Sequence, residues 1–140
     1  MTDAMNVFTY GSLMFAPVWT QVVRGDYRSK IATIHGFRRV CVAGGNYPAL
    51  VIAPRAVPLI GRLYMDVGVA DVARLDHFET SEYGRVAIAV TVEGIAVTAQ
   101  AYLAVNVSAL TDTDWSVTDF EINGLPLFLA TYLVKNNPRR

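Results

Sequence analysis

Near the start of the chain, Asn6-Val7-Phe8-Thr9-Tyr10 runs directly into Gly11-Ser12-Leu13-Met14. The β-branched and aromatic side chains of the first part predict a buried strand, and the glycine that follows predicts a turn at its end. At such a turn the backbone N–H groups of Gly11, Ser12 and Leu13 leave the sheet ladder and can converge on one point. The stretch therefore predicts a core strand that leads into an anion-binding loop, suited to a carboxylate or a developing oxyanion.

Two side chains of this stretch have alternative interpretations. Ser12 is the obvious nucleophile, but the flanking glycines of a nucleophile elbow are absent and neither His35 nor His77 forms a local signature with it. We interpret Ser12 as a hydrogen-bond donor, the alternative being a turn serine bonded to its own backbone. Tyr10 either lines a pocket at the strand end or belongs to the core.

The composition favours one cytoplasmic globular domain over residues 1–140. A chain of 140 residues can bury a core without disulfide or metal. Although 53% of the residues are hydrophobic and only 17% are charged, no apolar run reaches the roughly 18 residues of a membrane span. The first residues lack the basic and apolar regions of a secretory signal. We therefore expect no membrane association.

Metals, cofactors and nucleic acid are not expected partners. The single cysteine, Cys41, and the 2 histidines have no ligand-like spacing. The 12 basic and 12 acidic residues balance, and the basic clusters Arg38-Arg39 and Arg139-Arg140 are too small for a surface that tracks phosphates. A small molecule is the expected ligand, and Trp115, Phe120 and the C-terminal apolar residues are candidates for a homodimer interface.

The rest of the chain predicts strands interrupted by short amphipathic helices. Helices are expected from Pro17 to Gly25, over 69–78 and over 126–134. Strands are expected over 31–35, 37–43, 48–53, 59–66, 83–92 and 97–105, the last two joined by a turn at Glu93-Gly94, with another turn at 44–46. Because the last two strands are apolar at nearly every residue, both of their faces are expected to be covered, by helices or by closure into a barrel. The predicted class is α+β.

Glu79 is the strongest candidate for proton transfer. It ends the predicted helix, where the dipole disfavours negative charge, and Asp76 and Glu82 add like charge on either side. Burial by Phe78 and Tyr83 would raise its pKa further, toward the range of a general base. The alternative is a solvated surface carboxylate.

Two other candidates have roles that the sequence leaves open. Arg85 could pair with Glu79 or with Asp76, and such a pair would lower the pKa of the carboxyl group. Tyr47-Pro48 follows a double glycine and forms either a pocket wall or a plain turn.

Several motifs in their order resemble the gamma-glutamyl cyclotransferase-like family, in particular its gamma-glutamylamine cyclotransferase-like branch. They are Val7-Phe8-Thr9-Tyr10-Gly11-Ser12-Leu13, Tyr47-Pro48-Ala49-Leu50, Gly61-Arg62-Leu63-Tyr64, and Leu75-Asp76-His77-Phe78-Glu79 followed by Tyr83-Gly84-Arg85-Val86. The resemblance covers most of the chain. This chain departs from the family pattern after Glu79, where many relatives have a glycine and this chain has Thr80-Ser81.

The resemblance implies a small mixed β-barrel flanked by short helices, with a substrate cavity at its mouth. It implies that Glu79 is the general acid/base and that Tyr10, Gly11, Ser12 and Leu13 hold a γ-glutamyl group, with Tyr47, Tyr83 and Arg85 as further substrate-binding candidates. The implied reaction releases 5-oxoproline and a free amine, with no cofactor. The alternatives are a non-catalytic binding module of the same fold and a γ-glutamyl amide hydrolase or transferase.

Overall fold

The structure is a computed structural model in which residues 4–43, 47–105 and 107–130 are described. Five strands close into a barrel in the order β1 (Met5–Thr9), β5 (Leu59–Val67), β2 (Ser29–Ile34), β6 (Tyr83–Val92) and β7 (Ile95–Ala104). The β1–β7 pair is parallel and the other paired strands of the barrel are antiparallel. The α+β class and the small mixed barrel predicted from the sequence are confirmed.

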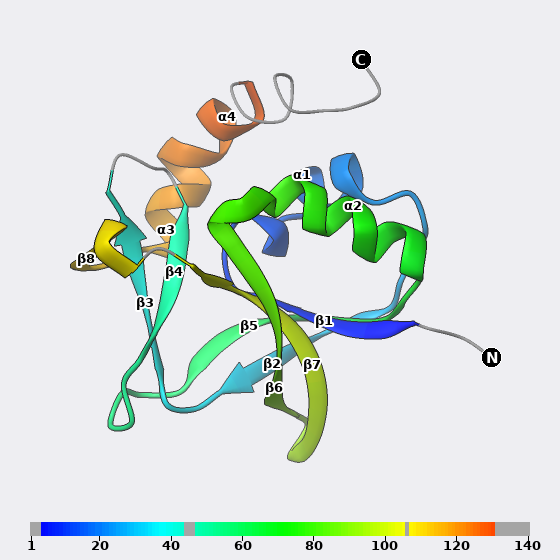
Figure 1. Cartoon of the computed structure of the whole chain (residues 1–140), viewed down its shortest axis with the longest axis horizontal. Helices are drawn as coiled ribbons and strands as arrows, with labels where there is room; N and C mark the ends of the chain where they lie inside the picture. Colours follow the sequence, from blue (N-terminus) through cyan, green and yellow to red (C-terminus); the bar gives the residue numbers. More distant parts are fainter. Residues whose placement is uncertain (1–3, 44–46, 106, 131–140) are drawn as a thin grey trace.

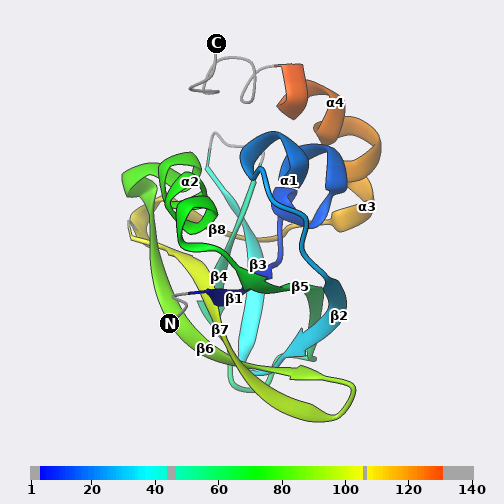
Figure 2. The ribbon, with the colours of Figure 1, turned by 90° about the vertical axis from the view of Figure 1, so that its right-hand side faces the viewer.

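A second sheet and several short helices flank the barrel. The sheet has the order β4 (Pro48–Ile52), β3 (Phe37–Val42), β8 (Leu110–Asp114). The α-helices are α1 (Ala16–Val22), α2 (Val69–Glu79), α3 (Val117–Asp119) and α4 (Leu125–Phe128), with 3₁₀ turns over Ser12–Met14, Thr80–Glu82 and Val107–Ala109 and a π-helical turn over Phe120–Gly124. Figures 1 and 2 both show α1 and α2 together above one end of the barrel.

Strand β1 is buried on both of its faces because it lies between two cores. Val7 belongs to the cluster beneath the helices, whereas Phe8 belongs to the cluster inside the barrel. On the paired strand β5, Leu63 faces the barrel cluster and Tyr64 the helix-side cluster. The alternation of side chains along a strand thus divides one apolar segment between two cores.

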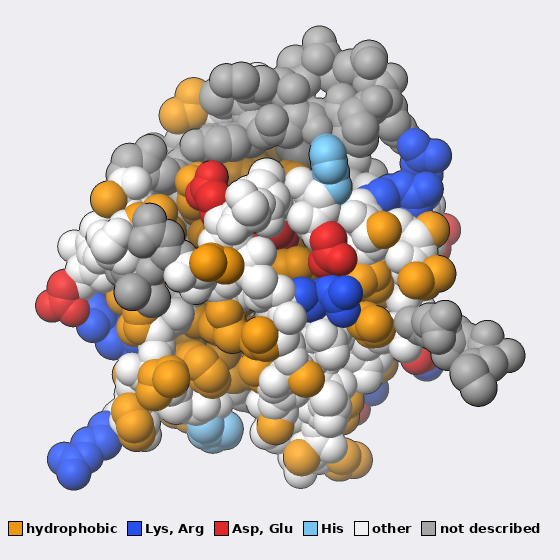
Figure 3. All heavy atoms as spheres, viewed as in Figure 1, with side chains coloured by type: hydrophobic (Ala, Val, Ile, Leu, Met, Phe, Trp, Pro, Cys, Tyr) orange, Lys and Arg blue, Asp and Glu red, His pale blue; other side chains and the backbone are white. Residues whose placement is uncertain are grey.

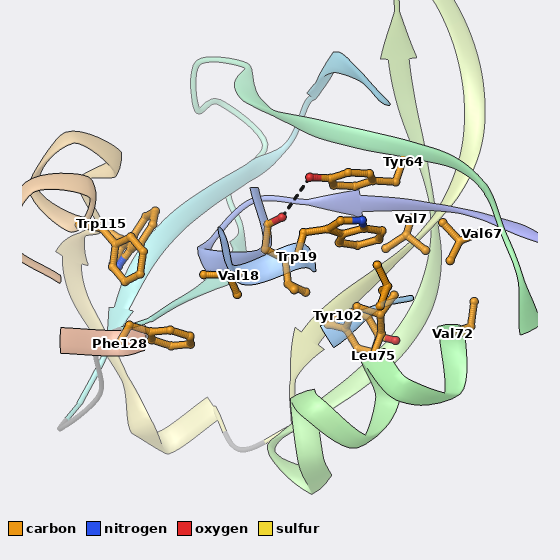
Figure 4. Close-up of a cluster of buried hydrophobic side chains, with 13 residues drawn as sticks. Val7, Val18, Trp19, Tyr64, Val67, Val72, Leu75, Tyr102, Trp115 and Phe128 are labelled. Atoms are coloured by element: carbon orange, nitrogen blue, oxygen red, sulfur yellow. Dashed lines mark hydrogen bonds between the residues drawn. The ribbon is translucent and has the colours of Figure 1, made fainter. Parts of the chain in front are cut away.

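An aromatic stack fastens α1 to the barrel. The rings of Trp19 and Tyr64 lie 3.6 Å apart at an interplanar angle of 4° (Figure 4). Tyr64 also donates its hydroxyl hydrogen to the carbonyl oxygen of Leu13, at 3.4 Å. The stack and this hydrogen bond hold the loop after β1 against β5.

Gly61 is required by the close approach of β1 to β5. A Cβ atom at this position would lie 2.3 Å from the carbonyl oxygen of Thr9 and 2.5 Å from Cζ of Phe8. Backbone atoms cannot yield as a flexible side chain does, so we expect Gly61→Ala to lower the free energy of unfolding by about 1–3 kcal/mol. Urea unfolding measures this effect. Gly36→Ala is unsuitable as a control because of its positive φ of 84°, whereas Gly84, whose Cβ would meet only Val105 at 3.7 Å, is suitable.

The predicted hairpin is present, but the expectation that both strand faces are covered is wrong. Glu93 and Gly94 adopt φ values of 51° and 82°, as in a tight hairpin turn. Away from the helices, side chains that alternate with the barrel-core residues face solvent: Ala87 and Ala89 on β6 are exposed, and Ile31 on β2 has 64% of its surface exposed. Apolar side chains gather over the lower part of the face in Figure 3. Closure of the barrel pairs the backbone hydrogen-bonding groups of the edge strands, but it leaves the outer face of the strands uncovered.

Other predicted boundaries and contacts also differ from the structure. Helix α1 ends at Val22, before Gly25, and β8 was not predicted. The predicted turn at 44–46 and the part of the C-terminal helix beyond residue 130 lie outside the described residues. Trp115 and Phe120, which the sequence suggested for a dimer interface, are 8% and 2% exposed and belong to the helix-side core. No helix within the described ranges has the length and apolarity to cross a membrane.

Candidate active site

A cavity of about 130 Å³ opens where the end of β1 meets the end of α2. Its walls come from β1, the loop after it, the start of β4, the turn after α2, and single residues of β6, β7 and α4. The lining residues are Phe8, Thr9, Tyr10, Gly11, Ser12, Leu13, Tyr47, Pro48, Phe78, Glu79, Thr80, Glu82, Tyr83, Tyr102 and Phe128. Every predicted site residue except Arg85 therefore lines one cavity.

The Gly11–Leu13 loop is held by its neighbours on several sides. The hydroxyl of Tyr10 donates to the carbonyl oxygen of Tyr102 at 2.5 Å, which fixes the strand end to β7. A 3₁₀ turn follows, in which the N–H of Met14 donates to the carbonyl oxygen of Gly11. The N–H groups that open such a turn have no acceptor within it, so those of Ser12 and Leu13 are donors that another group can use.

Gly11 permits the loop to approach β4. A Cβ atom on Gly11 would lie 2.8 Å from both Cδ and Cγ of Pro48. This close contact between two quoted motifs, Tyr10-Gly11-Ser12-Leu13 and Tyr47-Pro48, shapes one wall of the cavity. Tyr10 packs in the barrel core and also lines the cavity, so both of the alternatives considered for it, core residue and pocket residue, apply.

Glu79 is the last residue of α2, and its surroundings raise the pKa of its carboxyl group to about 8. Burial is the largest cause, followed by the negative charges of Asp76 and Glu82. The sequence predicted the direction of the pKa shift and these two charges. Desolvation by the cavity walls dominates, however, and the alternative of a freely solvated carboxylate is wrong.

Thr80 occupies the backbone conformation that a glycine would favour. Its φ and ψ are 61° and −164°, a region nearly restricted to glycine. The Thr80 hydroxyl donates to the carbonyl oxygen of Glu79 at 2.5 Å and accepts from the N–H of Glu82 at 3.3 Å. These bonds stabilise the turn that follows Glu79 in a conformation that glycine adopts more readily than threonine.

Two tyrosines beside this turn build another part of the cavity wall. Tyr47 donates its hydroxyl hydrogen to Oε1 of Glu82 at 3.1 Å, and Tyr83 donates to the carbonyl oxygen of Pro48 at 2.8 Å. Their ring centroids are 6.2 Å apart, in an edge-to-face arrangement. Burial raises the pKa of Tyr83, so its phenol stays protonated at neutral pH. Tyr47-Pro48 is thus a pocket wall and not merely a turn.

Arg85 does not reach the cavity. Its Nε lies 3.0 Å from Oδ1 of Asp76, so of the two carboxyl groups considered it pairs with Asp76. The same Oδ1 accepts a hydrogen bond from the hydroxyl of Tyr102 at 2.6 Å. Because Arg85 and Tyr102 are directly opposite on β6 and β7, both side chains lie on the same face and meet at Asp76.

The cavity is also lined by Phe8, Thr9, Tyr102 and Phe128, which were not predicted as site residues. Tyr102 carried the clearest signal, since it is the only aromatic residue in an aliphatic strand and its hydroxyl needs a partner once buried. Phe128 carried none, because its place depends on how α4 packs beside Phe78 and Phe120.

Among the described residues, no three His, Cys, Asp or Glu side chains cluster in a way that could hold a metal ion. The chemistry that the cavity residues themselves offer is proton transfer and hydrogen bonding. A carboxyl group with a pKa of about 8 exchanges protons readily near neutral pH. Backbone N–H donors on another wall can stabilise a developing negative charge.

Comparison with known proteins gives a family match and several similar folds. The family described as gamma-glutamyl cyclotransferase, AIG2-like, matches residues 7–117. No curated protein sequence matches the chain significantly. The solution structure of an Arabidopsis thaliana protein is similar with a TM-score of 0.70 and 22% identity, over 99% of this chain and 89% of that one.

Two further solved structures share the fold. A gamma-glutamyl cyclotransferase is similar with a TM-score of 0.68 and 16% identity, over 97% of this chain and 89% of that one. An AIG2-like protein from Mus musculus is similar with a TM-score of 0.58 and 23% identity, over 73% of this chain and 78% of that one. At these identities the likeness concerns the fold alone.

Proposed function

The chain belongs to the gamma-glutamyl cyclotransferase, AIG2-like family, and from this membership and its cavity we propose that it converts a γ-glutamyl amine or γ-glutamyl amino acid to 5-oxoproline and a free amine. The observation that carries the proposal is that Glu79 and the Gly11–Leu13 loop line the same cavity. One supplies a carboxyl group with a raised pKa, and the other supplies backbone N–H donors.

The proposed reaction is an intramolecular cyclisation of the substrate. The α-amine nitrogen forms a bond to its own γ-carbonyl carbon, which gives a five-membered ring and an oxyanion. The bond from that carbon to the departing nitrogen then breaks. Because the attack is intramolecular, no protein nucleophile is needed, and folding the substrate into the reactive geometry accounts for much of the rate. This agrees with the interpretation of Ser12 as a donor.

Glu79 moves the two protons that the reaction requires. The substrate arrives with an α-ammonium group, which cannot attack until it loses a proton. Glu79 accepts this proton as general base and returns it to the departing nitrogen as general acid. It then takes the second proton from the ring nitrogen, and this proton is released with the amine, which leaves as an ammonium ion. The N–H groups of Ser12 and Leu13, with that of Gly11, stabilise the oxyanion.

Product analysis tests the proposed function. The purified protein is incubated with γ-glutamyl amino acids and γ-glutamyl alkylamines, and the products are separated by chromatography. Formation of 5-oxoproline with one equivalent of amine is expected. Free glutamate would identify a hydrolase, a new amide would identify a transferase, and binding without any product would identify a non-catalytic module.

The pKa of Glu79 predicts how activity depends on pH. As general base, Glu79 must be ionised, so kcat/KM is expected to rise with pH and to reach half its maximum near the pKa of about 8. Asp76→Asn should move this midpoint to lower pH, since it removes a like charge that raises the pKa. Initial rates between pH 5 and about 10 measure both. An Asp76→Asn midpoint at higher pH would contradict the assignment.

A further inference from the structure

Arg39 of strand β3 extends toward the end of β1, behind the proposed substrate loop. Its Nη1 donates to the carbonyl oxygen of Tyr10 at 2.7 Å and lies 3.5 Å from the carbonyl oxygen of Ile60. Its guanidinium carbon lies 5.7 Å from the centroid of the Trp115 ring. Arg39 is not among the described residues that line the cavity. It therefore contacts the loop from outside the site.

The charge of Arg39 has no carboxylate partner among the described residues. The adjacent Arg38 pairs with Asp112 and Asp114, at 2.9 and 2.8 Å. Arg39 makes no ion pair within the described part of the chain, and its Nε is buried there without a hydrogen-bond partner. Burial lowers the pKa of Arg39. A half-buried, unpaired cation is costly, so its strongest contact, the Tyr10 carbonyl oxygen, calls for an explanation.

That contact acts on a peptide group shared with the cavity. The carbonyl of Tyr10 and the N–H of Gly11 belong to one trans peptide unit, in which they point in opposite directions. Holding the oxygen on the Arg39 side turns the N–H of Gly11 away from Arg39, and Gly11 lines the cavity. A charge-assisted hydrogen bond to the oxygen also polarises the unit, which makes the N–H a stronger donor.

We propose that Arg39 is a positioning residue that aims and polarises the Gly11 N–H for the oxyanion of the cyclisation step. This inference rests on the proposed function. It adds a cation that acts through one peptide group without contacting substrate. Because the oxyanion exists only after attack, the benefit appears in the transition state and not in substrate binding.

Kinetics of Arg39 variants test the inference, with Arg38→Met as the matched control on the same strand. For Arg39→Met we expect kcat to fall about 10–100-fold with KM changed less than about 3-fold, a part of the loss seen when an oxyanion donor is removed. Arg39→Lys, which retains charge and one hydrogen bond, should recover most of kcat. Equal kcat values for Arg39→Met and Arg38→Met, or a loss confined to KM, would overturn the inference.

A spectroscopic measurement keeps this inference distinguishable from the proposed function. A hydrogen bond to the Tyr10 carbonyl deshields the amide nitrogen of Gly11, so the Gly11 ¹⁵N resonance should move upfield in Arg39→Met and stay in place in Arg38→Met. This holds even if no γ-glutamyl compound is turned over. An unmoved Gly11 resonance in folded Arg39→Met would refute the orienting contact. If Arg39→Met does not fold, an Arg39→Lys protein with wild-type kcat and Gly11 shift supports the charge-assisted contact, and one with the wild-type shift but a kcat reduced 10-fold or more overturns it.

Discussion

Replacement of Glu79 by glutamine is expected to reduce kcat/KM for 5-oxoproline formation by about 10²–10⁴-fold. Glutamine keeps the size and hydrogen-bonding capacity of the side chain but can neither accept the ammonium proton nor return one to the departing nitrogen. The quantity measured is 5-oxoproline released per unit time at pH 8 and at several substrate concentrations. Undiminished product formation would exclude Glu79 as the acid/base residue.

Stability provides the control for this variant. In the folded protein the pKa of Glu79 is about 8, above the ordinary value of 4.5. Between these values the folded state holds a proton that the unfolded state has lost, so the contribution of Glu79 to stability falls as pH rises. The amide never ionises, and Glu79→Gln should therefore melt no lower than wild type at pH 8.

Two other glutamate variants separate the role of Glu79 from a general effect of charge. Glu93→Gln changes an exposed carboxylate paired with Lys30, outside the cavity, and should retain wild-type activity. Glu82→Gln changes the second carboxylate of the cavity, which accepts from Tyr47, and should have a smaller effect than Glu79→Gln. A larger loss in Glu82→Gln would transfer the acid/base role to Glu82.

The fold was predictable wherever local pattern and tertiary environment agree. Strand β1 and the hairpin at Glu93-Gly94 follow from β-branched residues and turn chemistry. Strand β8, with the sequence LTDTD, has no apolar pattern and becomes a strand by pairing with the edge of β3. The exposed outer face of β6 could not be predicted, because an apolar run looks the same whether a barrel closes around it or helices cover it.

The candidate site was predictable as a set of motifs but not in its contacts. Glu79 stood out through its charged neighbours, yet burial dominates its pKa, and the cavity that it lines includes residues as distant in sequence as Phe8 and Phe128. The choice of Asp76 as the partner of Arg85 depends on the register between β6 and β7. No local pattern encodes such a register, and the same holds for the reach of Arg39 to the Tyr10 carbonyl.

Asp71→Ala is expected to lower the free energy of unfolding by about 3–5 kcal/mol. Asp71 is 4% exposed in the first turn of α2 and accepts four hydrogen bonds. The donors are the N–H groups of Arg24 and Gly25, both at 2.9 Å, the hydroxyl of Tyr27 at 2.6 Å and Nη1 of Arg74 at 2.5 Å. Alanine leaves these donors unpaired and frees the 24–27 segment from α2.

Urea unfolding at pH 7 measures the loss, and Asp112→Ala is the control. Asp112 is also paired with an arginine, but its side chain is 99% exposed, so its removal should change the free energy of unfolding by about 0–1 kcal/mol. Equal losses in the two variants would show that the hydrogen bonds of Asp71 contribute no more than a surface ion pair does.

The pH dependence of stability gives a second, independent measurement of the Asp71 network. Burial disfavours the charged form of Asp71, but the hydrogen bonds from Tyr27, Gly25, Arg24 and Arg74 outweigh it and lower the pKa from 3.8 to about 2. A lowered pKa in the folded state stabilises the protein above the unfolded value, and this contribution is lost as pH falls through the folded value. The shift corresponds to about 2 kcal/mol.

The stability difference between wild type and Asp71→Asn should therefore be constant above about pH 5 and shrink by this amount between about pH 4 and pH 2. A difference that stays constant to pH 2 would mean that the Asp71 charge does not stabilise the fold.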